Sequence, residues 1–472
     1  MGHERRWGMR GDGPALATDA INAAIAHAHA RGGGEIVLPA GRHLSFSIRL
    51  LSGVTLRLEE GCVLEAADPT IHGGTYDAAE PNPHDLWQDF GHSHWRNSLI
   101  WGEDLEDVAI LGPGRIDGAG LTREGPGSRW SRQAGEFPLS MAGLSAEAMA
   151  ELSPAVEAIA GRGNKAIALK RVKRARIDGL TIFRGGHFAV LASGCEDLVL
   201  RDLVVDTNRD GLDIDACRDV LVSGCRVNTP NDDAIVLKSS LALGELIPTE
   251  RVVIEHCEVS GFDLGTMLDG TFGRTQLLSP DQDRVTGRIK LGTESNGGFR
   301  DVTIRDCRFT RSRGLALEVV DGGTMENIVA ERLRLHEVTT APIFLRVGDR
   351  RRGPEGTPIG AMRNIALRDI EAFDILPDYA ATIAGLPESP IRNVTLSNIR
   401  LSYSGGGSAE WAERRPGDLP EAYPEPSMFG PSPVHGLWAR HVDGLKIENL
   451  ALETTTPDGR PARLFENVRE AP

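Results

Sequence analysis

Acidic side chains gather in two neighbouring stretches of the sequence. Residues 206–217 read DTNRDGLDIDAC and include Asp210, and residues 228–240 read NTPNDDAIVLKSS and include the pair Asp232 and Asp233. Carboxyl groups held close together repel one another as anions, so at least one keeps its proton while its neighbours stay ionised. A protonated and an ionised carboxyl side by side can act as general acid and general base, the pair that hydrolysis of a glycosidic bond requires.

An internal repeat brings the two stretches together in space. Residues 189–210 align with residues 211–232, 22 positions each, so that Cys195 falls on Cys217, and weaker copies follow towards the carboxyl terminus. Apolar residues alternate within each copy, the period of strands with one buried face, and helical periodicity is nearly absent. A short repeat of strands and turns is typical of a solenoid whose coils stack about 4.8 Å apart. The sequence therefore predicts an all-β fold, a parallel β-helix.

Two registers of this repeat are open. A strict 22-residue period sets Asp210 against Asp232, whereas matching the alternation of Leu212 to that of Ile235 slips Asp210 onto Asp233. In both registers the three carboxyl groups fall within about one coil rise, near 5 Å, plus the reach of their side chains.

The stack needs a cover at its first coil and carries long insertions. We expect one domain over 1–472, with an amphipathic capping helix over about 18–31 that buries Ile21, Ala24, Ile25 and Ala28. We expect loop insertions over about 68–97, 120–163 and 404–433, the second with a helix within 145–161. Long loops on a rigid scaffold commonly wall a binding site.

A basic motif follows the carboxylates. In GRIKLGTESNGG, Arg288 and Lys290 alternate with apolar residues, so both side chains leave the same strand face. Two cations on the face that carries the carboxylates could clamp the carboxylate of an acidic sugar, the arginine as a two-pronged donor.

The motifs are N-x-D, then D-D about 20 residues later, then R-I-K, all inside a solenoid pattern. Their order resembles that of glycoside hydrolase family 28, which contains polygalacturonases and rhamnogalacturonan hydrolases. The resemblance covers roughly 7–450, including the opening WGMRGDG and the capping-helix region. It implies a right-handed parallel β-helix and inversion at the anomeric carbon. It also implies that Asp232 is the general acid, that Asp210 and Asp233 hold the attacking water, and that Arg288 and Lys290 contact the substrate.

The sequence departs from the family pattern at two places. Arg209 stands where the family has threonine beside the catalytic groups, and the family's G-H-G motif is absent. The 22-residue register stacks His187 under Arg209, so His187 is our candidate for the missing histidine. The loss of G-H-G argues against plain homogalacturonan as the substrate. The further candidates for contacts to substrate are Asn208, Lys238 and Glu294.

Composition restricts the partners. A formal net charge of −15 argues against binding nucleic acid through bulk charge, and no apolar run is long enough for a membrane-spanning helix. His92 and His94 lie near carboxylates in the first insertion, but the assigned chemistry requires no metal, and we expect neither a metal nor another cofactor. The expected partner is a poly- or oligosaccharide, anionic in character; the sequence defines no oligomeric state.

Several alternatives stay open. The same fold could hydrolyse a different glycan, could eliminate across a uronate as a lyase does, or could bind glycans without cleaving them. The early insertions would favour cutting from a chain end. The amino terminus shows no secretory signal, yet degradation of a polymer favours the periplasm or the exterior.

Overall fold

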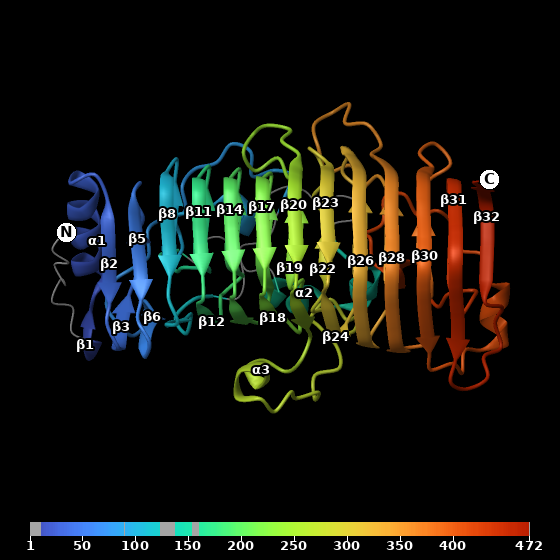
Figure 1. The fold of residues 1–472 in the computed structure, drawn as a ribbon, viewed down its shortest axis with the longest axis horizontal. Helices are drawn as coiled ribbons and strands as arrows, with labels where there is room; N and C mark the ends of the chain where they lie inside the picture. Colours follow the sequence, from blue (N-terminus) through green and yellow to red (C-terminus); the bar gives the residue numbers. More distant parts are fainter. Residues whose placement is uncertain (1–10, 89, 123–136, 153–159, 472) are drawn as a thin grey trace.

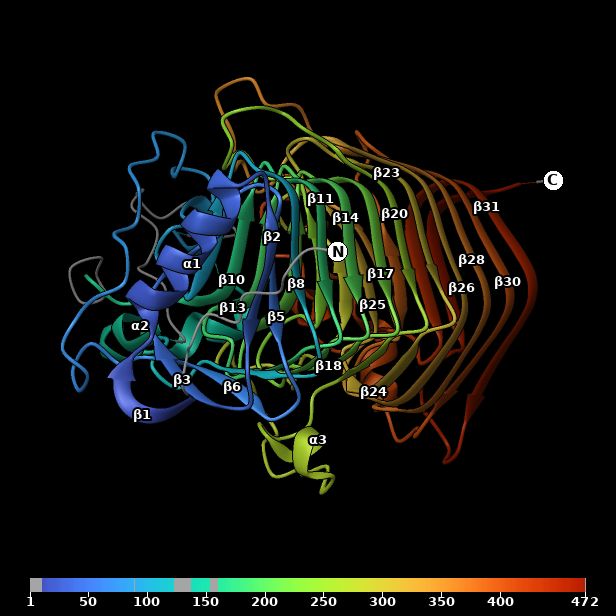
Figure 2. The same ribbon diagram turned by 60° about the vertical axis from the view of Figure 1, so that its left-hand side comes forward.

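The computed structural model describes residues 11–88, 90–122, 137–152 and 160–471. Its strands form one continuous stack in which every pairing between strands is parallel (Figure 1). The chain winds round in coils, and each coil adds to three ladders of parallel strands, which the turned view shows obliquely (Figure 2). The predicted right-handed parallel β-helix is confirmed.

The first ladder carries most of the candidate site residues and is called the site ladder below. It contains β4 Ile48–Arg49, β7 Ile100–Glu103, β10 Lys165–Lys170, β13 Phe188–Ser193, β16 Asp210–Asp215, β19 Ile235–Lys238, β22 Ile289–Leu291, β25 Leu315–Val319, β27 Ile343–Val347, β29 Ala381–Ala384, the start of β31 Leu437–Thr454, and β32 Arg463–Glu470.

The second ladder contains β2 Gly34–Leu38, β5 Val54–Leu58, β8 Glu106–Leu111, β11 Lys173–Asp178, β14 Glu196–Arg201, β17 Arg218–Ser223, β20 Thr249–Glu255 and β23 Phe299–Arg305. The third contains β1 Gly11–Leu16, β3 Gly41–Ser45, β6 Cys62–Ala66, β9 Arg115–Asp117, β12 Thr181–Phe183, β15 Val204–Asp206, β18 Arg226–Asn228, β21 Glu258–Ser260 and β24 Arg308–Ser312. In the later coils both ladders continue through the long strands β26 Thr324–Val338, β28 Ala361–Ile375, β30 Ile391–Tyr403 and β31.

Alternation within the strands builds the interior. In β14, for example, Leu198 and Leu200 are fully buried while the residues between and beside them are not. All six cysteines are buried and free of disulfides, and burial raises the pKa of the Cys62 thiol to about 12. The thiols therefore pack as small apolar groups in the interior.

The capping helix α1 spans Thr18–Ala30 and covers the first coil (Figure 1). Its buried residues are the four predicted from the sequence: Ile21, Ala24, Ile25 and Ala28. The helix stops before Gly32 and Gly33, which adopt positive φ angles of 91° and 114° and turn the chain into β2. Among the described residues, no helix is long and apolar enough to cross a lipid bilayer.

The expected insertions lie between strands of consecutive coils. The first joins β6 to β7 and contains η1 Phe90–Ser93; the second joins β9 to β10 and contains η2 Leu139–Gly143 and α2 Ala146–Leu152; the third joins β30 to β31 and contains η4 Ala409–Glu413 and η5 Pro426–Phe429. Most of the remaining part of the helix expected within 145–161 lies outside the described residues. A fourth excursion, between β21 and β22, contains α3 Thr266–Asp269 and projects from the stack (Figure 1).

Candidate active site

The three carboxylates predicted from the sequence lie together on the site ladder. Asp210 begins β16, and Asp232 and Asp233 form the turn that leads into β19. Leu212 pairs with Ile235, and the Gly211 amide donates to the Asp233 carbonyl at 3.0 Å, so Asp210 lies beside Asp233. The register that follows the apolar alternation is therefore the one the structure adopts. One oxygen from each of the three carboxylates lies within 4.8 Å of the other two.

These carboxyl groups have different surroundings. Asp210 and Asp233 are 2% and 1% exposed, whereas the side chain of Asp232 is 26% exposed. Burial, and next the charge of Asp232, raise the pKa of Asp210 well above its usual range. Burial alone would also raise the pKa of Asp233, but the charges of Arg288 and Lys290 hold it well below its usual range. The surroundings thus favour a proton on Asp210 and a negative charge on Asp233.

Arg209 lies directly on the exposed carboxylate. Its Nε and Nη2 donate to Asp232 Oδ2 at 3.2 and 2.9 Å, and its Nη1 lies 3.5 Å from Nδ1 of His187. His187 immediately precedes β13 and stacks under Arg209, as the 22-residue register predicts. Burial and the charge of Arg209 hold the pKa of His187 well below its usual range, so the ring is neutral. Asn208 accepts a hydrogen bond from Asn231 at 2.6 Å.

Arg288 and Lys290 lie next to the cluster but inside the protein. Lys290 lies in β22, which pairs with β19, and Arg288 immediately precedes this strand; the two residues are 3% and 2% exposed. Arg288 Nε donates to Asp233 Oδ1 at 2.6 Å, and Lys290 Nζ lies 2.5 Å from Asp233 Oδ2. The other two nitrogens of Arg288 bind Glu425, from the third insertion, at 3.0 and 2.6 Å. Both cations that the resemblance assigns to substrate binding are thus engaged by carboxylates of the chain.

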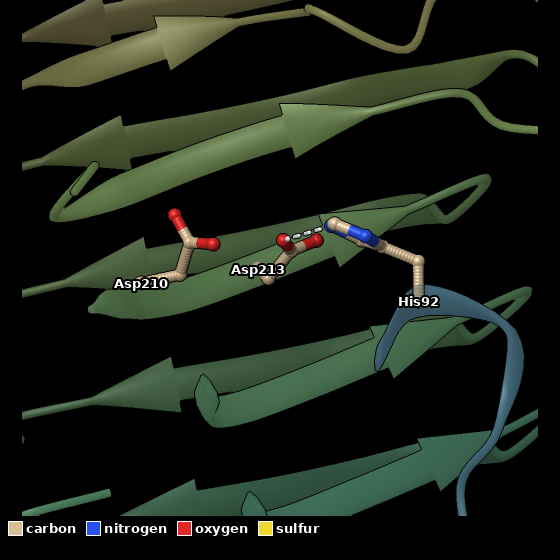
Figure 3. A group of neighbouring side chains, drawn as sticks. All are labelled: His92, Asp210 and Asp213. Carbon is tan, nitrogen blue, oxygen red and sulfur yellow. Dashed lines mark hydrogen bonds and ion pairs between the residues drawn. The ribbon is translucent and has the colours of Figure 1, made fainter. Parts of the chain in front are cut away.

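A histidine of the first insertion reaches the same strand. Leu212 and Ile214 of β16 point into the core, so Asp213 points outward, where His92 Nε2 lies 3.2 Å from its Oδ2 (Figure 3). Figure 3 shows Asp210 and Asp213 on one strand, with His92 approaching from another segment of the chain. The alternation in DGLDID could have marked Asp213 as outward-facing. No sequence signal joins it to His92, 121 positions away.

His92, Asp210 and Asp213 also have the donor types of a divalent metal site, with ligand atoms within 4.8 Å of one another. The Lys238 ammonium, however, lies 3.6 Å from Asp213 Oδ2 and already supplies positive charge there. Lys238 also lies 3.1 Å from Glu294. Burial opposes ionisation of both groups. Nevertheless, the charges of Glu294 and Asp213 hold the pKa of Lys238 well above its usual range. The charge of Lys238, foremost among the nearby cations, holds the pKa of Glu294 well below its usual range.

The insertions cover the outer face of the site ladder on both sides of the carboxylates. On the amino-terminal side, Trp95 of the first insertion packs with Phe188 and Leu191 of β13. On the carboxyl-terminal side, Phe429 of the third insertion packs with Trp438 of β31. The partly exposed Asp232 lies in the coil between these two covered regions.

Comparisons with known proteins agree with this architecture. No family model matches the chain. It is 24% identical over 420 residues to a protein from Vitis vinifera named probable polygalacturonase, a match that covers 84% of this chain and 73% of that protein. The hyperthermoactive exopolygalacturonase from Thermotoga maritima superposes with a TM-score of 0.65 at 18% identity over 96% of this chain and 92% of that one. The family 28 exopolygalacturonase of Yersinia enterocolitica gives 0.62 at 16% identity, over 98% and 76%.

Proposed function

We propose that the chain is a polygalacturonase-like glycoside hydrolase and that it cleaves a glycosidic bond in a pectin-like poly- or oligosaccharide that contains uronic acid or rhamnose. The observation that carries this proposal is the carboxylate cluster. Asp210, Asp232 and Asp233 offer oxygens within 4.8 Å of one another, and their surroundings favour a proton on one and a negative charge on another.

In the proposed reaction Asp232 gives a proton to the oxygen of the departing sugar. Asp210 and Asp233 hold a water molecule, take its proton and direct its oxygen to the anomeric carbon, so that the configuration there inverts. The exposure of Asp232 suits the group that must meet the substrate. For this step, the proton favoured on Asp210 passes to Asp232, whose oxygen lies within 4.8 Å, so that Asp210 is ionised when it takes a proton from the water.

The covered regions on either side of Asp232 support cleavage near a chain end. Trp95 and Phe429 belong to insertions that pack on the strand faces along which a long polymer would otherwise extend. We therefore propose release of mono- or disaccharides rather than random cutting. Chromatography of early products from polygalacturonate tests this proposal, because random cutting would release a ladder of longer fragments.

A reducing-end assay tests the reaction itself. Wild type and Asp232→Asn are compared on polygalacturonate, rhamnogalacturonan fragments and their oligosaccharides, with EDTA present. We expect the variant to lose about 10²- to 10⁴-fold in activity, because it lacks the proton donor. Asp202→Asn, in a surface turn, is the matched control and should retain wild-type activity.

Other outcomes of this assay would contradict the proposal. An unsaturated product that absorbs in the ultraviolet would indicate elimination rather than hydrolysis. Activity that survives Asp232→Asn would remove that residue from the reaction. No release from any pectic substrate would indicate a different glycan or a binding function. Proton NMR of the first-formed anomer tests inversion.

A further inference from the structure

Glu425 reaches the catalytic centre from the third insertion, 137 positions beyond Arg288 in the chain. Its side chain is 4% exposed and accepts hydrogen bonds from Nη1 and Nη2 of Arg288 at 3.0 and 2.6 Å. This is the planar, two-pronged pairing in which arginine binds a carboxylate most specifically. Glu425 therefore occupies the position on Arg288 that a sugar carboxylate would need.

A second arginine fixes Glu425 in this position. Arg313 Nη1 lies 3.1 Å from Glu425 Oε1 and 2.8 Å from Asp281 Oδ2, and Arg313 is 2% exposed. The hydroxyl of Ser140 in turn donates to the Asp281 carbonyl at 2.5 Å. Residues from three excursions, the second insertion, the segment between β21 and β22, and the third insertion, thus meet at this cluster, whose cations and carboxylates are mutually paired.

We propose that Glu425 is a positioning residue of the catalytic centre and takes the place of a substrate carboxylate on Arg288. With both terminal nitrogens held by Glu425, the guanidinium keeps one orientation, in which Nε stays on Asp233. Arg288 then serves to hold the base and does not read the substrate. The sugar unit that binds next to β22 is consequently recognised through its hydroxyl groups, as a neutral sugar is. This inference rests on the proposed function and refines its substrate class.

Kinetics of Glu425 variants test the positioning role. In Glu425→Ala the guanidinium loses its anchor, and we expect kcat to fall by about 100-fold, the scale of a catalytic group displaced by about 1 Å. KM for a uronate oligosaccharide should not rise, because Glu425 does not contact the substrate. Added formate should enter the vacated position and restore part of kcat in Glu425→Ala, but not in Glu425→Gln, whose amide still fills it.

The matched control is Glu421→Gln, in the same insertion, where the glutamate pairs with the exposed Arg351 at 2.8 Å. It should keep wild-type kcat and show no response to formate. A rise in KM with unchanged kcat in Glu425→Ala would overturn the proposal, since it would place Glu425 among the groups that bind substrate. Unchanged kinetic constants would overturn it as well.

Thermal unfolding tests whether a carboxylate binds at the Glu425 position without relying on enzyme activity. Formate that binds folded Glu425→Ala raises its Tm by mass action, whereas wild type and Glu425→Gln should show no such rise. If no pectic substrate is hydrolysed, the proposed function fails, and the rise in Tm still decides whether this position takes a carboxylate. If Glu425→Ala does not fold, Glu425→Asp, which withdraws the carboxylate by one methylene, is compared with Glu425→Gln in the kinetic assay. Equal, wild-type kcat in those two would contradict the proposal.

Discussion

Asp210 and Asp233 lie side by side in adjacent coils, yet their surroundings favour opposite charge states. Burial leaves Asp210 with a raised pKa, whereas the charges of Arg288 and Lys290 bring the pKa of Asp233 far down. The difference comes from the neighbouring coil, because Arg288 and Lys290 contact Asp233 directly. The surroundings of two residues of one type thereby shift their pKa values in opposite directions.

Lys290 offers a direct test of this division. In Lys290→Met the stem still packs but the charge is lost, so the pKa of Asp233 should rise. Because the proposed base acts when ionised, the acid limb of kcat/KM should move to higher pH by about one unit. The pH profile on the responding substrate measures the shift. Lys446→Met removes an exposed lysine as control, and an acid limb that coincides in Lys290→Met and wild type would contradict the assignment of Asp233.

Asp215 makes stability depend on pH. Burial raises its pKa to about 6 from 3.8, although the amide and hydroxyl of Ser240 donate to it at 2.7 and 2.5 Å. The folded state therefore binds this proton more tightly than the unfolded state, and the resulting stability is present below about pH 4 and lost as the pH rises through 6. A shift of about two units corresponds to about 3 kcal/mol.

Asp215→Asn removes the titratable carboxyl group and leaves a neutral side chain at every pH. Relative to wild type, its free energy of unfolding should rise between pH 4 and pH 7 by up to about 3 kcal/mol. Urea titrations at several pH values measure the difference, with the exposed Asp301→Asn as control. A difference that stays constant with pH would show that Asp215 does not titrate in this range.

At the scale of elements, α1 protects the first coil. Ile25 is fully buried between the helix and the coil beneath it. Ile25→Ala should lower the free energy of unfolding by about 2–5 kcal/mol. Because stability in a stack of coils is largely a sum of neighbour contacts, the loss should be concentrated in the amino-terminal coils. Hydrogen exchange of β2 and β5 measures it. Ala26→Ser, on the exposed helix face, should change stability little, and a uniform loss across all coils would contradict the local model.

The elements also show which features the sequence could predict. Apolar alternation runs through every coil, so the β-helix and the capping helix could be derived from local pattern, whereas the one-residue slip that sets Asp210 beside Asp233 is one of two registers that the pattern leaves open. The contacts of His92 with Asp213 and of Glu425 with Arg288 could not. Both contacts are made by insertions without repeat periodicity, across 121 and 137 positions, and depend on how each loop folds back onto the stack. Arg288 and Lys290 alternate with apolar residues as expected, but the pairing of Arg288 with Glu425 depends on how the third insertion folds.

The charge of the whole molecule bears on how it meets an anionic polymer. The formal net charge is −15, and the cations expected to meet substrate lie in ion pairs: Arg209 with Asp232, Arg288 and Lys290 with Asp233, and Lys238 with Glu294. A polyanion approaching this centre therefore encounters the repulsive field of the protein with little local compensation.

Salt should consequently favour the encounter. As ionic strength rises from about 0.01 to about 0.15 M, the Debye length falls from about 30 to about 8 Å, and KM for polygalacturonate should fall by a few-fold. Fully methyl-esterified polygalacturonate has the same backbone without the charge, so its KM, where it is cleaved, should not change. If KM for polygalacturonate instead rises with salt, the cations near Asp232 attract the polymer despite their ion pairs. Arg209, whose side chain is 23% exposed, would be the cation placed to attract it, since Arg288 is buried.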